Sequence, residues 1–246
     1  MTFNSDNEIK REHFQLKETI TTIIAEKDKY IETAKGEIKK RRNEIEQFIQ
    51  DDEFFEACLK PYDFSKKDPE IIRKMCESSE KLNVGPMATV AGIIAEYAVK
   101  AMVSKGAKYA IVDNGGDIAL FSNRIVNIGI FTGKQCTGKL AYQVLPDDRI
   151  LGICTSSAKI GHSLSFGNTD AVTVISHNVA LADAAATALG NIVYSRQDVK
   201  NAFKIIKGIN EIIGAAIFID DKIGLWGDVL QIVPVDVPYE LITRGR

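Results

Sequence analysis

The stretch from Leu151 to Asn191 constrains the fold of this chain most. It opens with an apolar run, Leu151 to Cys154, which is typical of a buried strand. That run ends in three consecutive hydroxyl residues, Thr155, Ser156 and Ser157. A loop rich in Gly, Ser and Asn follows, and a second β-like run, 171–175, leads into an alanine-rich helix. Because ligands are usually held where strands end and helices begin, we interpret this stretch as the functional site.

The composition of the whole chain excludes several classes of partner. A chain of 246 residues is long enough to bury a full core. Its formal net charge of −2 gives no reason to expect nucleic acid or an acidic membrane surface as a partner. The first thirty residues are charged and lack the apolar segment of a signal peptide. No apolar run approaches the roughly 18 residues that a membrane helix needs.

The cysteine pattern points to a reducing compartment. The four cysteines are widely spaced and form no CxxC pair: Cys58, Cys76, Cys136 and Cys154. Such a pattern fits free thiols better than a disulfide framework or a zinc site. We therefore expect a soluble cytoplasmic protein.

The order of the predicted elements favours an α+β fold. We expect strands within 13–26, 109–112, 118–121, 125–131, 140–145, 151–154, 171–175, 215–219, 223–226 and 229–234. Helices are predicted from about 29 to 58, after Asp68-Pro69 (an N-cap with proline at the first helical position), from 86 to 106, from 180 to 193 and from 198 to 209. Because the regular βαβ order is missing, we expect largely antiparallel sheets with helices packed on them.

Two motifs invite a functional interpretation that we do not adopt. The basic run Lys39 to Arg42 could be a docking patch, but glutamates surround it, which favours a solvated helix face. The segment Gly133 to Lys139 matches seven positions of the phosphate-binding pattern GxxxxGK[ST]. Its eighth position is Leu140, and the residues that follow resemble a strand rather than a helix. We therefore reject a P-loop here.

Two glycine-containing segments leave alternatives open. Gly115 and Gly116 separate two β-like runs, which predicts a hairpin. The alternative is that they give a ligand access to backbone N–H groups beside Asp113 or Asp117. On the helix from 86 to 106, the small residues Ala88, Gly92 and Ala95 would admit a second backbone or a flat ligand, or would allow tight helix–sheet packing. Such small-residue faces also make a homodimer plausible.

Asp183 and Thr187 form a candidate metal site. They lie four residues apart and therefore share one face of the alanine-rich helix, away from its apolar stripe. A carboxylate and a hydroxyl one turn apart are the hard oxygen donors that Mg²⁺ prefers. The alternative is structural: the aspartate would complement the helix dipole in the first turn, and the threonine would bond back to the preceding turn.

The remaining polar residues of the central stretch also have two interpretations each. His162 could contact phosphate or transfer a proton, or could simply be exposed. His177 is interpreted as a surface cap. Cys154 ends an apolar run, which favours a buried structural thiol over a nucleophile. The three hydroxyls after it could bind phosphate or a flavin edge, or could satisfy backbone groups at the strand end.

Four motifs in this order resemble the ApbE-like superfamily, and most closely an uncharacterised cytoplasmic branch found in archaea and bacteria. They are VGPMATVAG (84–92), DNGGDIAL (113–120), CTSSAKIGHSLSFG (154–167) and LADAAATALGN (181–191). The best-known members are FAD:protein FMN transferases, which cleave FAD with magnesium and attach FMN to a threonine of a target protein. The resemblance implies a single ApbE-like (T-fold-like) domain over residues 1–246 with its core motifs in 82–191.

The resemblance also implies roles for individual residues. Asp183 and Thr187 match the magnesium pair Asp-x-x-x-Thr of the superfamily. Its flavin-site turn matches Asn114, Gly115, Gly116 and Asp117. Thr155 and Ser156 match its Thr-Ser strand end, and His162 matches the histidine that follows. Taken together, the predicted catalytic residues are His162 and Ser156, and the predicted cofactor contacts are Asn114, Gly115, Gly116, Asp117, Thr155, Ser157 and Met87.

The sequence departs from the transferases at two places. Transferases usually carry Ala-Lys-Gly where this chain has Ile94-Ala95-Glu96, so the lysine is absent and Glu96 sits near its place. Their His-Ile-Ile-Asp-Pro segment is replaced by residues 162–167. We therefore carry two hypotheses: a magnesium-dependent enzyme acting on FAD or a related nucleotide, with a protein acceptor, and a non-catalytic flavin- or nucleotide-binding protein on the same fold.

Overall fold

The computed structural model describes residues 9–131, 139–157, 167–235 and 243. Its strands are β1 (Lys10–Leu16), β2 (Thr19–Ala25), β3 (Tyr109–Asn114), β4 (Asp117–Ser122), β5 (Val126–Gly129), β6 (Leu140–Val144), β7 (Asp147–Ser156), β8 (Ala171–Ser176), β9 (Ile212–Ile219), β10 (Lys222–Gly227) and β11 (Gln231–Pro234). Its helices are α1 (Asp28–Asp51), α2 (Phe54–Ala57), α3 (Glu70–Glu80), α4 (Val90–Ser104), α5 (Val179–Ile192) and α6 (Val199–Ala202), with the 3-10 segments η2 (Pro86–Thr89) and η3 (Phe203–Ile205).

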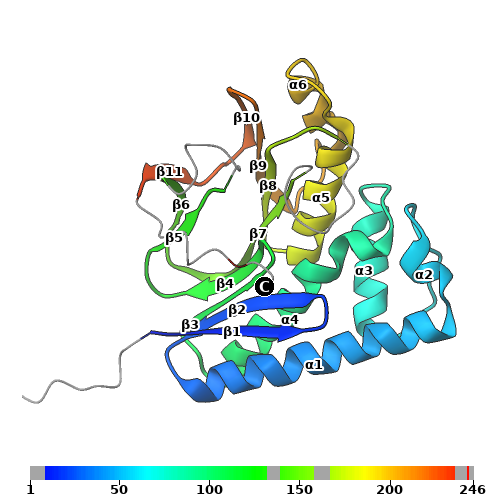
Figure 1. Ribbon diagram of the computed structural model, residues 1–246, viewed down its shortest axis with the longest axis vertical. Coiled ribbons are helices and arrows are strands. Elements are labelled where there is room, and N and C mark those ends of the chain that lie inside the picture. Colours follow the sequence, from blue (N-terminus) through cyan, green and yellow to red (C-terminus); the bar gives the residue numbers. More distant parts are fainter. Residues whose placement is uncertain (1–8, 132–138, 158–166, 236–242, 244–246) are drawn as a thin grey trace, which may run out of the picture.

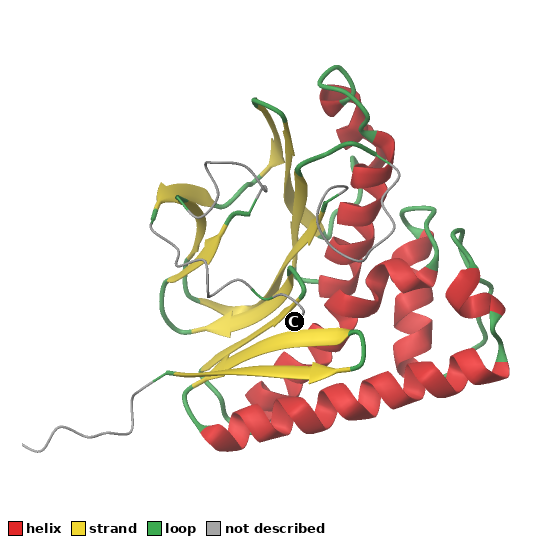
Figure 2. Cartoon of the chain, in the orientation of Figure 1, coloured by secondary structure: helices red, strands yellow, loops and turns green. Residues whose placement is uncertain are grey.

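The molecule has three layers (Figures 1 and 2). An eight-stranded sheet in the order β1-β2-β3-β4-β7-β8-β9-β10 forms the middle layer. Helices cover one of its faces, and a three-stranded sheet, β11-β6-β5, packs on the other. Every strand pair in both sheets is antiparallel. The predicted α+β class with antiparallel sheets is confirmed.

Alternation along the central strands separates two cores. On β3, Ala110 and Val112 pack toward the helices, whereas Ile111 packs toward the small sheet. On β7, Cys154 faces the helices and Ile153 faces the small sheet. Successive residues of these strands therefore face alternately the helices and the small sheet.

Several predicted boundaries were wrong, and the helix predicted over 198–209 is instead the four-residue α6 followed by the 3-10 segment η3. β7 begins at Asp147 rather than Leu151, because its first residues are charged and exposed and so hide the strand pattern. The long first helix ends at Asp51, and the separate short helix α2 follows it. Pro69 has ψ 144° and is the N-cap of α3 rather than its first helical residue. The residues after the rejected P-loop match do form a strand, β6.

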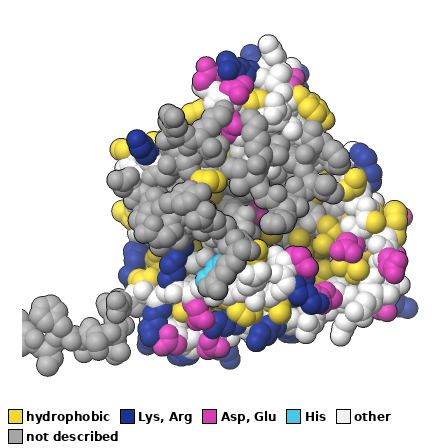
Figure 3. Space-filling model, viewed as in Figure 1, with side chains coloured by type: hydrophobic (Ala, Val, Ile, Leu, Met, Phe, Trp, Pro, Cys, Tyr) yellow, Lys and Arg dark blue, Asp and Glu magenta, His cyan; other side chains and the backbone are white. Residues whose placement is uncertain are grey.

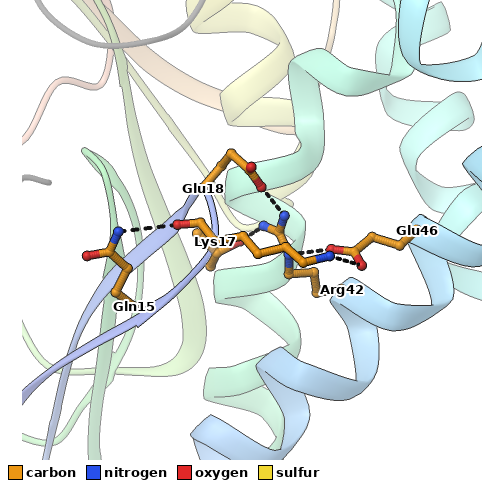
Figure 4. Close-up of polar contacts among 6 residues, drawn as sticks. Gln15, Lys17, Glu18, Arg42 and Glu46 are labelled. Atoms are coloured by element: carbon orange, nitrogen blue, oxygen red, sulfur yellow. Dashed lines mark hydrogen bonds and ion pairs between the residues drawn. The ribbon is translucent and has the colours of Figure 1, made fainter.

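The basic run on α1 is only partly a solvated face. Lys39 and Lys40 are exposed, as predicted. The side chains of Arg41 and Arg42 are only 14% exposed, because both are held in ion pairs. Arg42 Nε lies 2.6 Å from Glu46, and its guanidinium also pairs with Glu18 at the β1–β2 turn (Figure 4). This arginine therefore fastens the first hairpin to α1, while charges of both signs line the surface over that helix (Figure 3).

One helical segment, Pro86–Ser104, is long and apolar enough to cross a membrane by length and composition, with a mean hydropathy of 1.3. The expectation that no such run exists was wrong by this measure. Half of its most apolar window is buried within the protein, where α4 packs against α1, α5, β3 and β4. Its position as the central helix of the layer accounts for its apolar composition.

Candidate functional site

Several predicted site residues within the described part of the chain gather at one end of the large sheet, where β3 turns into β4. Asn114 pairs with Asp117 across this turn, and Gly115 and Gly116 form the two-residue loop with φ values of 67° and 107°. Such positive φ values favour glycine, so the hairpin interpretation of these two glycines is confirmed. Asp117 in turn lies opposite Cys154 on β7, which brings the turn beside the start of the central stretch.

Side-chain hydrogen bonds fix this turn to its surroundings. The Asn114 amide donates to the Ala91 carbonyl at 3.1 Å, which ties the hairpin to the start of α4. Asp113 points to the opposite face of the sheet and accepts from the Gly116 N–H at 2.9 Å. Thr243 Oγ1 lies 2.5 Å from Asp113 Oδ2, so a residue near the end of the sequence also contacts the turn.

Helices α4 and α5 run antiparallel beside the turn and touch through two carboxylates. The Gly92 N–H donates to Asp183 Oδ2 at 2.8 Å, and the Val179 N–H donates to Glu96 Oε2 at 3.1 Å. A Cβ on Gly92 would lie 2.9 Å from Asp183 Cβ and 2.9 Å from the Val179 carbonyl oxygen. The small residue at position 92 therefore serves close packing with α5 rather than with the sheet.

Two acidic side chains share this interface. Burial raises the pKa of Asp183 to about 7, although the backbone N–H groups of Gly92 and Ala91 act in the opposite direction. Burial also raises the pKa of Asp117, and the nearby negative charge of Asp183 raises it further. No Lys or Arg among the described residues forms an ion pair with either carboxylate. Among the described residues, the site thus concentrates negative charge without a Lys or Arg paired to it.

Asp183 and Thr187 do not have the purely structural roles considered for them, namely a first-turn aspartate and a threonine bonded to the preceding turn. The first turn of α5 contains no acidic residue, and the side chain of Asn178 caps the helix by accepting from the Leu181 N–H at 3.1 Å. Asp183 lies beyond that first turn. The half-buried Thr187 makes no side-chain hydrogen bond to the preceding turn within the described part of the chain. A carboxylate and a free hydroxyl one turn apart fit the oxygen-donor chemistry of Mg²⁺.

The donor set is small. The described residues contain no group of three or more His, Cys, Asp and Glu side chains that could hold a metal ion. Mg²⁺ usually binds through one or two carboxylates together with water and substrate phosphates, so a pair of protein oxygens suits it better than a transition metal.

The three hydroxyls that end β7 do not act together. Thr155 faces the small sheet, where its Oγ1 lies 3.0 Å from Thr173 Oγ1. Ser157 Oγ donates to the Asp170 carbonyl at 2.8 Å and so satisfies a backbone group near the strand end. Ser156 shares the parity of Cys154 and therefore lies on the helix side, with Asp117 and Asp183. The sequence analysis treated the three hydroxyls as one group. In the structure, successive residues of the strand face opposite sides of the sheet, so Thr155 and Ser156 are separated.

The other candidates have mixed outcomes. Cys154 is fully buried, and burial together with Asp117 raises the pKa of its thiol well above the usual value, which confirms a structural thiol. Met87 in η2 is half-buried and packs on the helix-side core. His177 Nδ1 lies 2.9 Å from the Ile150 carbonyl oxygen, so its ring contacts backbone. His162 lies outside the described residues.

Glu96, the acid near the place expected for the lysine of the transferases, has a defined role. Its carboxylate accepts from the Val179 N–H at the start of α5 and also pairs with Lys100, four residues further along α4. Its charge is therefore neutralised inside the fold by a lysine and a helix N-terminus. It lies one turn along α4 from Gly92, the partner of Asp183.

Sequence reasoning missed two features of the site. It did not place Asp117 beside Asp183, because their approach depends on the packing of α5 over the β4–β7 pair. It also missed the contact from Thr243 to Asp113, which joins residues 130 positions apart. The small size of Gly92 was the one sequence feature that indicated a close contact on α4. It did not show that the contacting element would be α5.

Comparisons with known proteins agree with the geometry. A family model described as "AbpE bacteria" matches residues 2–204. A UPF0280 protein of Methanosarcina barkeri is 47% identical over 236 residues, which cover 96% of this chain and 93% of that protein. A UPF0280 protein of Methanothrix thermoacetophila is also 47% identical over 236 residues, covering 96% and 99% of the two chains.

Solved structures with this fold include flavin transferases. The apo form of the flavinyl transferase ApbE of Pseudomonas stutzeri aligns over 100% of both chains with a TM-score of 0.58 and 12% identity. The flavin transferase ApbE of Vibrio cholerae aligns over 89% of this chain and 97% of its own with a TM-score of 0.57 and 14% identity. At such low identity the likeness shows the fold. The chain belongs to the UPF0280 family and to the family of the "AbpE bacteria" model, and it has the fold of the ApbE flavin transferases.

Proposed function

We propose that this protein is a magnesium-dependent enzyme that cleaves the pyrophosphate of FAD or a related nucleotide and transfers the flavin-bearing phosphate to a protein acceptor. The proposal combines the ApbE fold with the chemistry of the site at the β3–β4 turn. The two ApbE neighbours are flavin transferases by name, and the acceptor follows from that likeness.

The observation that carries this proposal is a pair of neighbouring carboxylates. Asp183 is buried beside Asp117; burial raises the pKa of Asp117, and the negative charge of Asp183 raises it further. Such an arrangement is unfavourable in a purely structural interface, because neither negative charge pairs with a Lys or Arg among the described residues. A divalent cation would remove that penalty.

Asp183 and Thr187 are the residues that would hold Mg²⁺. The Gly92 N–H fixes the Asp183 carboxylate at 2.8 Å, so its position is set before any metal arrives. Bound there, Mg²⁺ would supply Lewis-acid stabilisation of the phosphoryl oxygens of the pyrophosphate.

The neighbouring residues would orient the substrate. The Asn114 side chain and the Gly115–Gly116 loop form a rigid turn that permits close approach of a ring or ribose. Ser156 lies on the helix side of the sheet and is proposed, with His162, to contact phosphate. Thr155, Ser157 and Met87 remain predicted cofactor contacts.

The test is a titration of the purified protein with FAD, with and without Mg²⁺, following flavin fluorescence and then AMP and FMN by chromatography. Release of AMP that requires Mg²⁺ and is lost in Asp183→Ala is expected. Thr187→Val should raise the Mg²⁺ concentration needed for half-maximal rate. Asp63→Ala, which removes an exposed aspartate of a connecting loop, serves as the matched control and should retain full activity.

A second candidate function is a flavin- or nucleotide-binding protein without turnover. The observation that favours it is Glu96, since the lysine of the transferases is absent and the acid is committed to the start of α5. This candidate predicts saturable FAD binding with no AMP released at any Mg²⁺ concentration. Absence of both binding and turnover would contradict both candidates and would indicate a different ligand.

A further inference from the structure

A cavity of about 290 Å³ lies at the start of α5, where that helix packs against α3 and α4 (Figure 1). Its walls come from residues 74–81 at the end of α3, residues 93–100 of α4 and residues 177–180 at the start of α5. None of the described residues proposed to bind Mg²⁺ or the nucleotide lines it. Its volume lies at the lower end of the range for small-molecule sites.

Ser78 is a buried polar residue of this cavity without a partner. It lines the cavity from α3 and is only 4% exposed. No described residue forms a hydrogen bond with its hydroxyl. The neighbouring Ser79 does not line the cavity, and its hydroxyl donates to the Cys76 carbonyl at 3.1 Å. Because a buried hydroxyl without a hydrogen bond costs free energy, a polar molecule bound in the cavity would gain one at Ser78.

The start of α5 presents hydrogen-bond donors to the same cavity. Two of its first N–H groups are used inside the fold, since Val179 donates to Glu96 and Leu181 donates to the Asn178 side-chain oxygen. The Ala180 N–H has no acceptor among the described residues, and Ala180 lines the cavity. Asn178 also lines it and keeps its amide NH₂ group as a further donor. Free N–H groups at a helix N-terminus attract anions.

Lysines outnumber acids along the cavity. Lys74, Lys81 and Lys100 line it, together with the acids Glu77 and Glu96. Lys100 pairs with Glu96, so these two charges balance each other. Glu77 is exposed, and solvent therefore screens its charge.

The other two lysines can turn toward a ligand at little cost. Lys74 pairs with Glu70, and Lys81 pairs with Glu211, but neither of these acids lines the cavity. The side chains of both pairs are between 40% and 53% exposed. Because half-exposed ion pairs contribute little to stability, both ammonium groups are available to an anion in the cavity.

The donors suit a phosphate group better than a carboxylate. The cavity is lined by lysines and by no described arginine, and lysine binds phosphate as a point charge, whereas arginine is the typical bidentate partner of a carboxylate. His177 also lines the cavity, and its Nδ1 lies 2.9 Å from the Ile150 carbonyl oxygen. Since a carbonyl only accepts, Nδ1 carries the hydrogen, and Nε2 can accept from a protonated phosphate oxygen.

We propose that this cavity is a binding site for the phosphate group of a small molecule. Ser78, the Asn178 amide and the Ala180 N–H contact the phosphate oxygens. Lys74 and Lys81 supply the positive charge. The proposal goes beyond the proposed function, because it requires neither Mg²⁺ nor a flavin and uses a different end of α5.

The first test is calorimetric titration of the full chain with inorganic phosphate and with glycerol phosphate. Mg²⁺ is left out, so that the proposed metal site recruits no phosphate. We expect saturable binding of one molecule per chain that weakens as the NaCl concentration rises. Ser78→Ala should weaken it about tenfold or more, because a hydrogen bond to a charged group is lost. Ser79→Ala is the matched control and should leave the affinity unchanged, since Ser79 lies outside the cavity.

The second test removes the positive charge. The double variant Lys74→Gln, Lys81→Gln should weaken phosphate binding about tenfold or more and reduce its dependence on salt. The control is the double variant Lys105→Gln, Lys108→Gln, which removes two exposed lysines beyond the end of α4 and should bind as wild type does. Circular dichroism of each variant checks that the chain remains folded.

Tighter binding of glycerol phosphate than of inorganic phosphate supports the site and identifies its ligand as a phosphate ester, whereas equal binding supports the site with free phosphate as the ligand. Absence of saturable binding for both probes overturns the proposal. So does binding that neither Ser78→Ala nor the lysine double variant at the cavity weakens, because the phosphate would then lie elsewhere. Asp183→Ala, which tests the proposed function, should leave phosphate binding unchanged, so the two proposals can fail separately.

Discussion

Glu96 and Asp183 are two buried carboxylates of the same helix pair, one turn apart, with 9% and 7% of their surfaces exposed. Both accept a hydrogen bond from a backbone N–H of the facing helix. They differ in their counter-charge, since Glu96 pairs with Lys100 whereas Asp183 lies beside a second acid, Asp117. The Mg²⁺ proposed at Asp183 would supply the counter-charge that Lys100 supplies to Glu96.

The largest expected effect follows from removing the unpaired charge. Asp183→Asn keeps the shape of the side chain and an oxygen that can accept from the Gly92 N–H, but it weakens a metal site. We expect the Mg²⁺-dependent rate of FAD cleavage to fall by about a thousandfold, in keeping with the several kcal/mol that a catalytic metal contributes. Steady-state kinetics with chromatographic detection of AMP measures this effect, and near-normal turnover in the folded variant would reject Asp183 as a metal ligand.

The second prediction concerns pH and the metal-free protein. The pKa of Asp183 is about 7 in the folded state and near its usual 3.8 when unfolded, so folding takes up a proton between these values. Stability therefore declines as pH rises from about 4 to 7 and is then constant, a loss of roughly 2 to 4 kcal/mol from this group. The raised pKa of Asp117 acts in the same direction.

Urea unfolding of the metal-free protein at several pH values measures that decline. Asp183→Asn should flatten it and should be more stable than wild type at pH 8, because the buried charge is gone. Addition of Mg²⁺ at pH 8 should stabilise wild type and leave the variant unchanged. Equal slopes in the two proteins would show that Asp183 is ionised in the folded state at low pH.

The third prediction tests how closely α4 must approach Asp183. Gly92→Ala places a Cβ 2.9 Å from Asp183 Cβ and from the Val179 carbonyl oxygen, so the helices must separate. We expect a loss of about 1 to 3 kcal/mol in the free energy of unfolding and a weaker response to Mg²⁺. Gly36→Ala is the control, since a Cβ there meets nothing within 4 Å on α1 and should stabilise by roughly 0.5 to 1 kcal/mol. Equal effects at both glycines would contradict the close approach.

Local patterns predicted most of the elements and two features of the candidate site from sequence. The hairpin at Gly115 and Gly116 follows from turn chemistry, and the Asp183–Thr187 pair follows from helical spacing. These features depend on residues close together in the chain. The resemblance of four motifs to the ApbE-like superfamily supplied the fold, which propensity alone would have left as an unspecified α+β arrangement.

The features that sequence did not predict depend on long-range packing or on strand parity. The bond from Gly92 to Asp183 joins residues 91 positions apart, and the contact from Thr243 to Asp113 spans 130. The division of Thr155 and Ser156 between two faces required knowing that both faces of the sheet are covered. Arg41 and Arg42 resembled a solvated face because their partners include the hairpin residue Glu18 and the ring of Tyr97 on α4.

The smallest expected effect belongs to the neutralised carboxylate. Glu96→Gln retains an oxygen that can accept from the Val179 N–H and loses only the ion pair with Lys100, whose side chain is 44% exposed. We expect a change of about 1 kcal/mol or less in the free energy of unfolding, because a half-exposed i,i+4 pair contributes little. The Mg²⁺ dependence of turnover should stay as in wild type, measured in the same FAD assay. If Glu96→Gln instead shifted the Mg²⁺ requirement as strongly as Thr187→Val, then Glu96 would belong to the metal site, and the contrast between the two carboxylates would have to be abandoned.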